Sequence, residues 1–432
     1  MKTSPTPVRY WILAVTTLSA FLMYIDRACL AWMLDSESFK KEIHLTSDQA
    51  SHLKSAFFWA YALAQVPAGW LAERFGKRTL MTVLIVLWSG FTAMSGFADG
   101  VAMLFVARIG CGLAEAGAYP ISGSLLSRWA HFNWRGFASG IVSLGGRLGF
   151  VLAPLITVKV ILLFGSWRWA GWAYGIAGLV VAWFFWRTFR ETPDGHPGCN
   201  DAERTLLGEG RDTSPADQAS GRGTKGYRFP LKAVLRDRSL WMMCGYQMLT
   251  NFGWAFVINS MSTYLRDVRH LSEEMNGYIS TLTLFIGMFG LLLGGLLTDW
   301  LTRKLGLRLG RLLPLSVTRF LSAAMCLACL WAESPWALAL CLGLMVFSTD
   351  SALPAVWAWA QDVGGRNVAP IFGWANMWGN FGAAIQAGTA GWLLTTFDKN
   401  GDQQELFVAC AIAFALAGVL SFGINADRKV AE

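Results

Sequence analysis

Charged side chains are scarce in this sequence. Asp, Glu, Lys and Arg make up 15% of the 432 residues, whereas a soluble domain carries about a quarter. Hydrophobic residues make up 54%. This balance is not typical of a soluble protein and indicates that most of the chain lies in apolar solvent.

The residues that support enzyme chemistry are also few. No pair of histidines has metal-binding spacing, and no glycine-rich phosphate loop follows a strand, so we expect no enzyme, no bound metal or cofactor and no ATP-driven pump. Most of the eight cysteines lie inside apolar runs. Cys326 and Cys329 have CxxC spacing without a second ligand pair nearby, so we interpret them as packing residues.

Basic residues outnumber acidic ones, 36 to 28, which gives a net charge of +8. They are distributed over alternate ends of apolar segments rather than gathered in one patch, which argues against nucleic-acid binding. The face that receives most of them, including Arg74, Arg128 and Arg303, is predicted to be cytoplasmic. Both termini are therefore expected in the cytoplasm, with the chain in a cell membrane, that of a bacterium being favoured.

Twelve apolar segments are long enough to cross a bilayer, for which about 20 residues are needed. The first is too long for a cleavable signal peptide and contains Asp26 and Arg27, so none is expected. The segments lie near residues 10–34, 49–72, 79–98, 101–126, 137–163, 168–189, 240–264, 275–298, 313–332, 336–360, 368–396 and 405–425.

A polar stretch divides the segments into two sets of six. Residues 191–238 are rich in proline, glycine and charge, and are predicted to be a partly disordered cytoplasmic linker between domains 1–190 and 239–432. The pattern Gly-x-x-x-acid, followed by basic residues and a glycine, occurs after the second segment of each half, at Gly69–Arg78 and from Gly295 onward. Such an internal repeat is expected of transporters built from two related bundles.

These motifs make the sequence resemble the major facilitator superfamily. Within it, the first half is similar to the anion:cation symporters, which include sugar-acid and phthalate permeases and sialin-type carriers. The matching residues are Tyr24-Ile-Asp26-Arg27, Phe57 to Gly69, Arg108 to Pro120, and Arg135-Gly136. Glu73 stands where the family's loop signature usually has Asp. The resemblance implies an all-α membrane protein with twelve transmembrane helices in two pseudo-symmetric six-helix bundles.

Six ionisable residues lie well inside predicted spans, where each needs a partner or a water-filled cavity. They are Asp26, Arg27, Arg108, Glu115, Arg147 and Asp350. Protonation of one or two of these carboxylates would leave a net positive cavity ready for an organic anion, which is a physical route to proton–anion coupling. The same charges could instead form an ion-pair network that holds the first bundle together.

The resemblance assigns roles to some of these residues. It implies that Asp26 and Glu115 are the protonatable groups, that Arg27 and Arg108 are the basic groups, and that Tyr61 touches substrate. Arg147 lies beside Gly146, where such symporters often have a polar amide, and we add it to the expected substrate contacts. The role of Asp350 is left open.

The second half offers amides and aromatic rings that suit a polyol. Trp357 and Asn376 fall near family substrate contacts, and Asn380 lies one turn after Asn376. The repeated loop is expected to act as a gate, because breaking its ion pairs would permit inward opening. The expected gating residues are Gly69, Glu73, Arg74, Gly76, Arg78, Asp299 and Arg303.

The favoured hypothesis is a monomeric proton-coupled symporter that imports a small organic anion, with aldonates and uronates preferred. An exchanger for phosphorylated sugars is an alternative, although the intramembrane carboxylates argue against it. A non-transporting sensor would be expected to carry a cytoplasmic extension larger than Asn425–Glu432. A multidrug antiporter fits poorly with six buried charges.

Overall fold

A computed structural model describes residues 4–209, 227–397 and 403–430, and within these ranges the secondary structure is helical. The first half contains the helices α1 (Val8–Asp35), α2 (Glu37–Glu42), α3 (Ser47–Phe75), α4 (Lys77–Ser95), α5 (Val101–Glu115), α6 (Ala118–Trp129), α7 (Arg135–Phe164), α8 (Arg168–Thr188) and α9 (Asp201–Gly208). The second half contains α11 (Leu231–Arg236), α12 (Arg238–Asn259), α13 (Met261–Asp267), α14 (Glu273–Ala328), α15 (Pro335–Ser351), α16 (Leu353–Val363), α17 (Val368–Phe397) and α18 (Gln404–Ser421).

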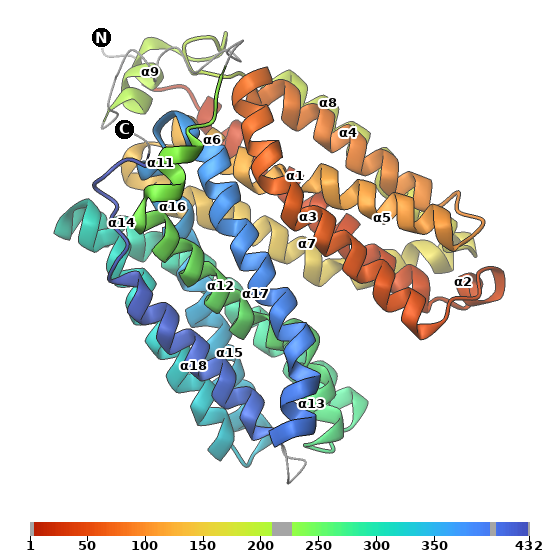
Figure 1. The fold of residues 1–432 in the computed structure, drawn as a ribbon. Helices are drawn as coiled ribbons and strands as arrows, with labels where there is room; N and C mark the ends of the chain where they lie inside the picture. The colour runs from red at the N-terminus through yellow and green to blue at the C-terminus, as the bar shows by residue number, and fades with distance from the viewer. Residues whose placement is uncertain (1–3, 210–226, 398–402, 431–432) are drawn as a thin grey trace. The chain divides into compact units, whose positions relative to one another are not determined.

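Each of the twelve predicted spans lies mainly on described helix. Eight helical stretches in the described part of the chain are long and apolar enough to cross a membrane. One of them contains α14, which carries two predicted spans. The remaining predicted spans lie on α3, α12 with α13, and α17. The long helices of each half are labelled in Figure 1.

The chain forms two compact units. The first comprises residues 1–132, 141–229 and 364–373, and the second comprises 133–140, 230–363 and 374–432. Each unit therefore takes one short segment from the opposite half of the sequence, which the predicted domain limits did not include. In the first unit α4 packs along α8 and α3 packs along α5, and in the second unit α14 packs along α15 and α18.

The second predicted span of each half is followed by a turn that needs glycine. Gly76 follows α3 with φ of 92°, and Gly306 lies inside the continuous run of α14 with φ of 80°. Non-glycine residues rarely adopt this backbone region because the Cβ atom collides with the backbone. A glycine with this conformation follows the acidic residue of the motif in both halves, three residues after Glu73 and seven after Asp299, which supports the internal repeat.

The fourth predicted span of each half is broken. α5 ends at Glu115 and α6 begins at Ala118, shortly before Pro120. α15 ends at Ser351 and α16 begins at Leu353, directly before Pro354. Proline lacks the backbone N–H and clashes with the preceding turn, so an interruption near it is expected. In both halves a buried acidic residue lies just before the break.

Part of the predicted linker is helical, while its residues 210–226 lie outside the described ranges. Asn200 caps α9 by accepting from the backbone N–H of Glu203 at 2.9 Å. The buried carboxylate of Glu203 accepts from the backbone N–H of Arg9 at 3.0 Å and forms an ion pair with its guanidinium group at 3.3 Å. These contacts attach the linker's first helix to the start of α1.

Candidate functional site

The centre of the site is an ion pair between α1 and α5. Arg27 donates from Nε and Nη2 to Oε2 of Glu115 at 3.1 and 3.0 Å. Glu115 is completely buried, whereas the Arg27 side chain keeps 14% of its surface exposed. A guanidinium that binds a carboxylate through two nitrogens has the fixed geometry that suits exchange with another carboxylate.

Aromatic rings surround the Arg27 guanidinium. Its central carbon lies 4.9 Å from the ring centre of Tyr24, 5.1 Å from that of Phe57 and 4.5 Å from that of Tyr61. Rings at these distances stabilise a cation through their negative faces. The structure thus brings Tyr61, predicted from the resemblance, into direct contact with the predicted basic group.

Arg108 contacts one of the aromatic rings that surround Arg27. Its guanidinium carbon is 4.6 Å from the Phe57 ring centre, so the Phe57 ring contacts both arginines. Its Nη2 points to the backbone carbonyl of Arg27 at 3.5 Å. Arg108 and Glu115 are both buried on α5, as their spacing of two helical turns predicts.

Asp26 is buried beside these groups, with Glu115 and Arg108 within electrostatic range. Neither of its carboxyl oxygens has a hydrogen-bond partner among the described residues. An ionised carboxylate without such partners is costly in an apolar interior. Asp26 and Arg27 are adjacent in sequence yet occupy different surroundings, because consecutive helical residues point about 100° apart.

Arg147 borders the aromatic edge of the site. It is partly buried on α7 and interacts electrostatically with Tyr119. The ring of Tyr119 lies 5.9 Å from that of Tyr24. A Cβ atom at Gly146 would lie 2.6 Å from the Tyr119 hydroxyl and 2.9 Å from the Tyr24 ring. Glycine at position 146 therefore allows the two tyrosines to approach α7.

The predicted substrate residues of the second half lie in the second unit. Trp357 on α16 is completely buried. Asn376 and Asn380 on α17 are half-buried, and Asn380 donates to the backbone carbonyl of Asn376 at 2.8 Å. Their roles in substrate binding stay predictions.

Asp350 has a charged neighbour that the sequence analysis missed. Arg319 on α14 is completely buried and lies within electrostatic range of Asp350. It donates from Nη2 to the carbonyls of Ser348 and Thr349 at 3.2 and 2.7 Å. These carbonyls lie at the end of α15, where a cation is favourable. The available signal was an arginine inside the predicted span 313–332.

The gating residues of the first half form two groups. Glu73 pairs with Lys77 at 3.1 Å and accepts from the Ser124 hydroxyl at 3.5 Å, both of them buried contacts. The backbone N–H of Arg78 donates to Glu191, and its guanidinium stacks 3.8 Å from the ring centre of Trp186. Arg74 is exposed. Gly69 lies close to α17, because a Cβ atom there would lie 2.7 Å from the backbone of Pro370.

The gating residues of the second half differ in exposure. Asp299 is buried and accepts from the backbone N–H groups of Gly136 and Phe137 at 2.9 and 2.8 Å, at the start of α7. A carboxylate is favourable at a helix N-terminus. Arg303 is exposed. Arg311 lies 3.8 Å from Asp299, and sequence analysis did not include it. The gating roles stay predictions.

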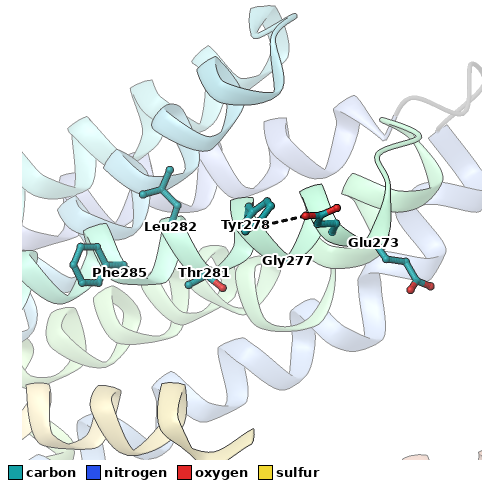
Figure 2. Close-up of a pocket in the computed structure, with 7 residues that line it drawn as sticks. Glu273, Gly277, Tyr278, Thr281, Leu282 and Phe285 are labelled. Carbon is teal, nitrogen blue, oxygen red and sulfur yellow. Dashed lines mark hydrogen bonds between the residues drawn. The ribbon is translucent and has the colours of Figure 1, made fainter. Parts of the chain in front are cut away.

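The second unit also has a shallow groove of about 540 Å³. It follows one face of α14 from Glu273 to Phe285, and the Tyr278 hydroxyl donates to Glu274 at 3.0 Å, as Figure 2 shows. None of the predicted site residues lines it.

The described helices are long and apolar and carry buried ionisable residues, which defines a multi-pass membrane protein. Residues 16–387 match the model of the Major Facilitator Superfamily. The chain belongs to that superfamily, which confirms the predicted fold class.

Relatives and solved structures match this chain over most of its length. The chain is 28% identical over 427 residues to a probable galactarate/D-glucarate transporter of Bacillus subtilis, covering 96% of this chain and 91% of the relative. It is 28% identical over 309 residues to a D-galactonate transporter of Escherichia coli, covering 70% and 69%. The crystal structure of the human organic anion transporter MFSD10 superposes with a TM-score of 0.71 at 14% identity, covering 96% of this chain and 100% of that one.

Proposed function

We propose that this chain is a proton-coupled symporter that imports a small organic anion, with sugar acids as the preferred substrates. The observation that carries the proposal is the buried cluster of Asp26, Arg27, Arg108 and Glu115, in which Arg27 holds Glu115 through two nitrogens. The similarity to transporters named for galactarate, D-glucarate and D-galactonate supports the substrate class.

The proposed cycle follows from the charges. When Glu115 takes up a proton, Arg27 loses its ionic partner and becomes available to the carboxylate of the substrate. Protonation of Asp26 removes a second negative charge from the same cluster, which leaves the two arginines to attract an anion. Release of substrate restores the Arg27–Glu115 pair and expels the proton. Alternating access of this kind couples the two solutes because the charges of the site are balanced when it is empty and deprotonated, or when it holds both proton and anion. A site that holds only one of the two solutes is left with unbalanced charge.

The test is uptake of labelled D-glucarate, galactarate and D-galactonate into proteoliposomes containing the full chain. We expect an inwardly directed proton gradient to drive accumulation of at least one of them, and a protonophore to abolish it. Asp26→Asn and Glu115→Gln should each remove gradient-driven uptake. Uptake that ignores the gradient, the protonophore and both substitutions would contradict proton coupling, and exchange-only transport would favour an anion exchanger.

A further inference from the structure

Two buried polar groups beside the charge cluster lack partners. The carboxyl oxygens of Asp26 on α1 and the indole Nε1 of Trp88 on α4 are buried, and none of these atoms has a hydrogen-bond partner among the described residues. The Trp88 indole lies close enough to the Asp26 carboxyl group to act on it as a hydrogen-bond donor, although no bond of ordinary length and angle joins them. A buried donor and a buried acceptor that both lack a partner, and that lie within reach of each other, form a matched pair.

The other titratable groups within electrostatic range of Asp26 have partners elsewhere or carry charge. On α1, the Cys29 thiol donates to the backbone carbonyl of Asp26 at 3.1 Å. On α8, the Tyr174 hydroxyl is 2.7 Å from that of Thr157. From α5 come one thiol and two charged side chains: Cys111, Arg108 and Glu115.

Trp88 differs chemically from all of these. An indole N–H is a donor that cannot accept, so it bonds more strongly to an ionised carboxylate than to the carbonyl oxygen of the neutral acid. Its side chain is completely buried, and the Trp88 backbone carbonyl lies 3.6 Å from the Cys111 thiol.

We propose that Trp88 is a positioning residue for the Asp26 proton, whose indole N–H bonds to the carboxylate once the proton has left. This inference rests on the proposed function, in which Asp26 carries a coupled proton. The bond lowers the cost of an ionised Asp26 in a dry site and so determines the pH at which the proton is released.

The test measures Asp26 directly by infrared spectroscopy of the full chain in lipid, using the carboxylic-acid C=O band that disappears in Asp26→Asn. Trp88→Phe keeps a ring and removes the donor. We expect the pH midpoint of the band to rise by about one to two pH units, because a hydrogen bond to a charged group is lost. An unchanged midpoint would overturn the proposal.

Trp129→Phe is the matched control. Trp129 is also buried in the first unit, but its Nε1 donates to the backbone carbonyl of Arg190 at 3.0 Å. Its substitution should leave the Asp26 midpoint in place, and an equal shift would show that loss of any buried indole suffices. If Trp88→Phe does not fold, Raman spectroscopy of the indole N–H in the unsubstituted chain replaces it. The Raman signal of one indole N–H should then change with pH in the unsubstituted chain and stay constant with pH in Asp26→Asn. If no indole signal changes with pH, the proposal is wrong.

The two hypotheses fail in different ways. If Trp88→Phe shifts the Asp26 band but proton gradients drive no uptake, the pairing stands and the proposed symport fails. If gradients drive uptake while Trp88→Phe leaves the Asp26 band unchanged, the symport stands and the role of Trp88 is wrong.

Discussion

At the scale of single residues, the account depends on the fork shape of Arg27. Arg27→Lys keeps the positive charge but cannot reproduce the two contacts to Glu115 or the planar packing among Tyr24, Phe57 and Tyr61. We expect substrate affinity to fall about 10- to 100-fold, which corresponds to roughly 1.4–2.8 kcal/mol. Isothermal titration with the best sugar acid measures this.

A matched arginine provides the control. Arg266 is exposed and pairs with its neighbour Asp267 at 2.7 Å. Arg266→Lys should leave affinity unchanged, because an exposed pair of this kind contributes little and lies outside the site. Equal affinity in Arg27→Lys and the unsubstituted chain would refute a forked anion contact at position 27.

The four central charges could be predicted from sequence because an ionisable residue inside an apolar run is conspicuous. Arg319 gave the same signal, and only its packing against the end of α15 shows what it does. Trp88 could not have been selected, because it is one of 22 tryptophans and its distinction is the carboxyl group that it faces. The gating motif predicted Asp299, whereas its contacts with Gly136 and Phe137 required the fold.

At the scale of elements, the turn at Gly306 determines how the two parts of α14 join. A Cβ atom at Gly306 would meet no neighbour within 4 Å, so its cost is backbone strain alone. Gly306→Ala should destabilise the protein by about 1–3 kcal/mol. Thermal unfolding in detergent, followed by tryptophan fluorescence, measures the effect as a lower apparent melting temperature.

Gly277 is the matched control on the same helix. It has ordinary helical backbone and also has no neighbour within 4 Å of an added Cβ. Gly277→Ala should stabilise by about 0.5–1 kcal/mol, because alanine favours a helix interior. Gly306→Ala with a melting temperature equal to or above that of Gly277→Ala would contradict the turn assignment.

The described part of the linker is expected to respond to pH through His196. Its ring packs against Trp129, its Nε2 bonds to the carbonyl of Thr188 at 3.0 Å, and its Nδ1 accepts from Gly198 at 3.0 Å. Burial lowers the pKa of His196 below its ordinary value of about 6.5. The unfolded segment therefore takes up the proton at a higher pH than the docked linker does. The contribution of His196 to the stability of the docked linker is present above the ordinary pKa of about 6.5 and is lost as pH falls through the lowered pKa.

Limited trypsin cleavage after Arg204, followed by mass spectrometry, measures this response. The ratio of cleavage in the unsubstituted chain to that in His196→Gln should rise as pH falls from about 8 to about 5, because glutamine does not titrate. Taking a ratio at each pH removes the pH dependence of the protease. A constant ratio would show that His196 does not control docking.

The helices themselves were largely predictable, since twelve apolar runs of sufficient length have few alternatives in a bilayer. The interruptions between α5 and α6 and between α15 and α16 were harder to predict. Pro120 and Pro354 signalled a disturbance, but the sequence did not show that each break begins within two residues of a buried acid, Glu115 or Asp350. Neither did the polar composition of residues 191–209 predict α9, which depends on its contacts with the start of α1.

At the scale of the whole molecule, the distribution of basic residues predicts both termini in the cytoplasm. In intact cells, a membrane-impermeant maleimide should label Lys41→Cys and should label Lys232→Cys only after permeabilisation. Both positions are exposed, and the native cysteines are buried or half-buried, so the unsubstituted chain should label weakly. The opposite pattern would reverse the predicted orientation.

The central claim is that a proton and an anion cross together through a site built on Asp26, Arg27, Arg108 and Glu115. A pH electrode in the weakly buffered medium around proteoliposomes tests it most directly. Addition of D-glucarate, or of whichever sugar acid the uptake assay selects, should make the medium more alkaline, and Asp26→Asn and Glu115→Gln should abolish that change. Substrate uptake by the unsubstituted chain with no alkalinisation would contradict the account.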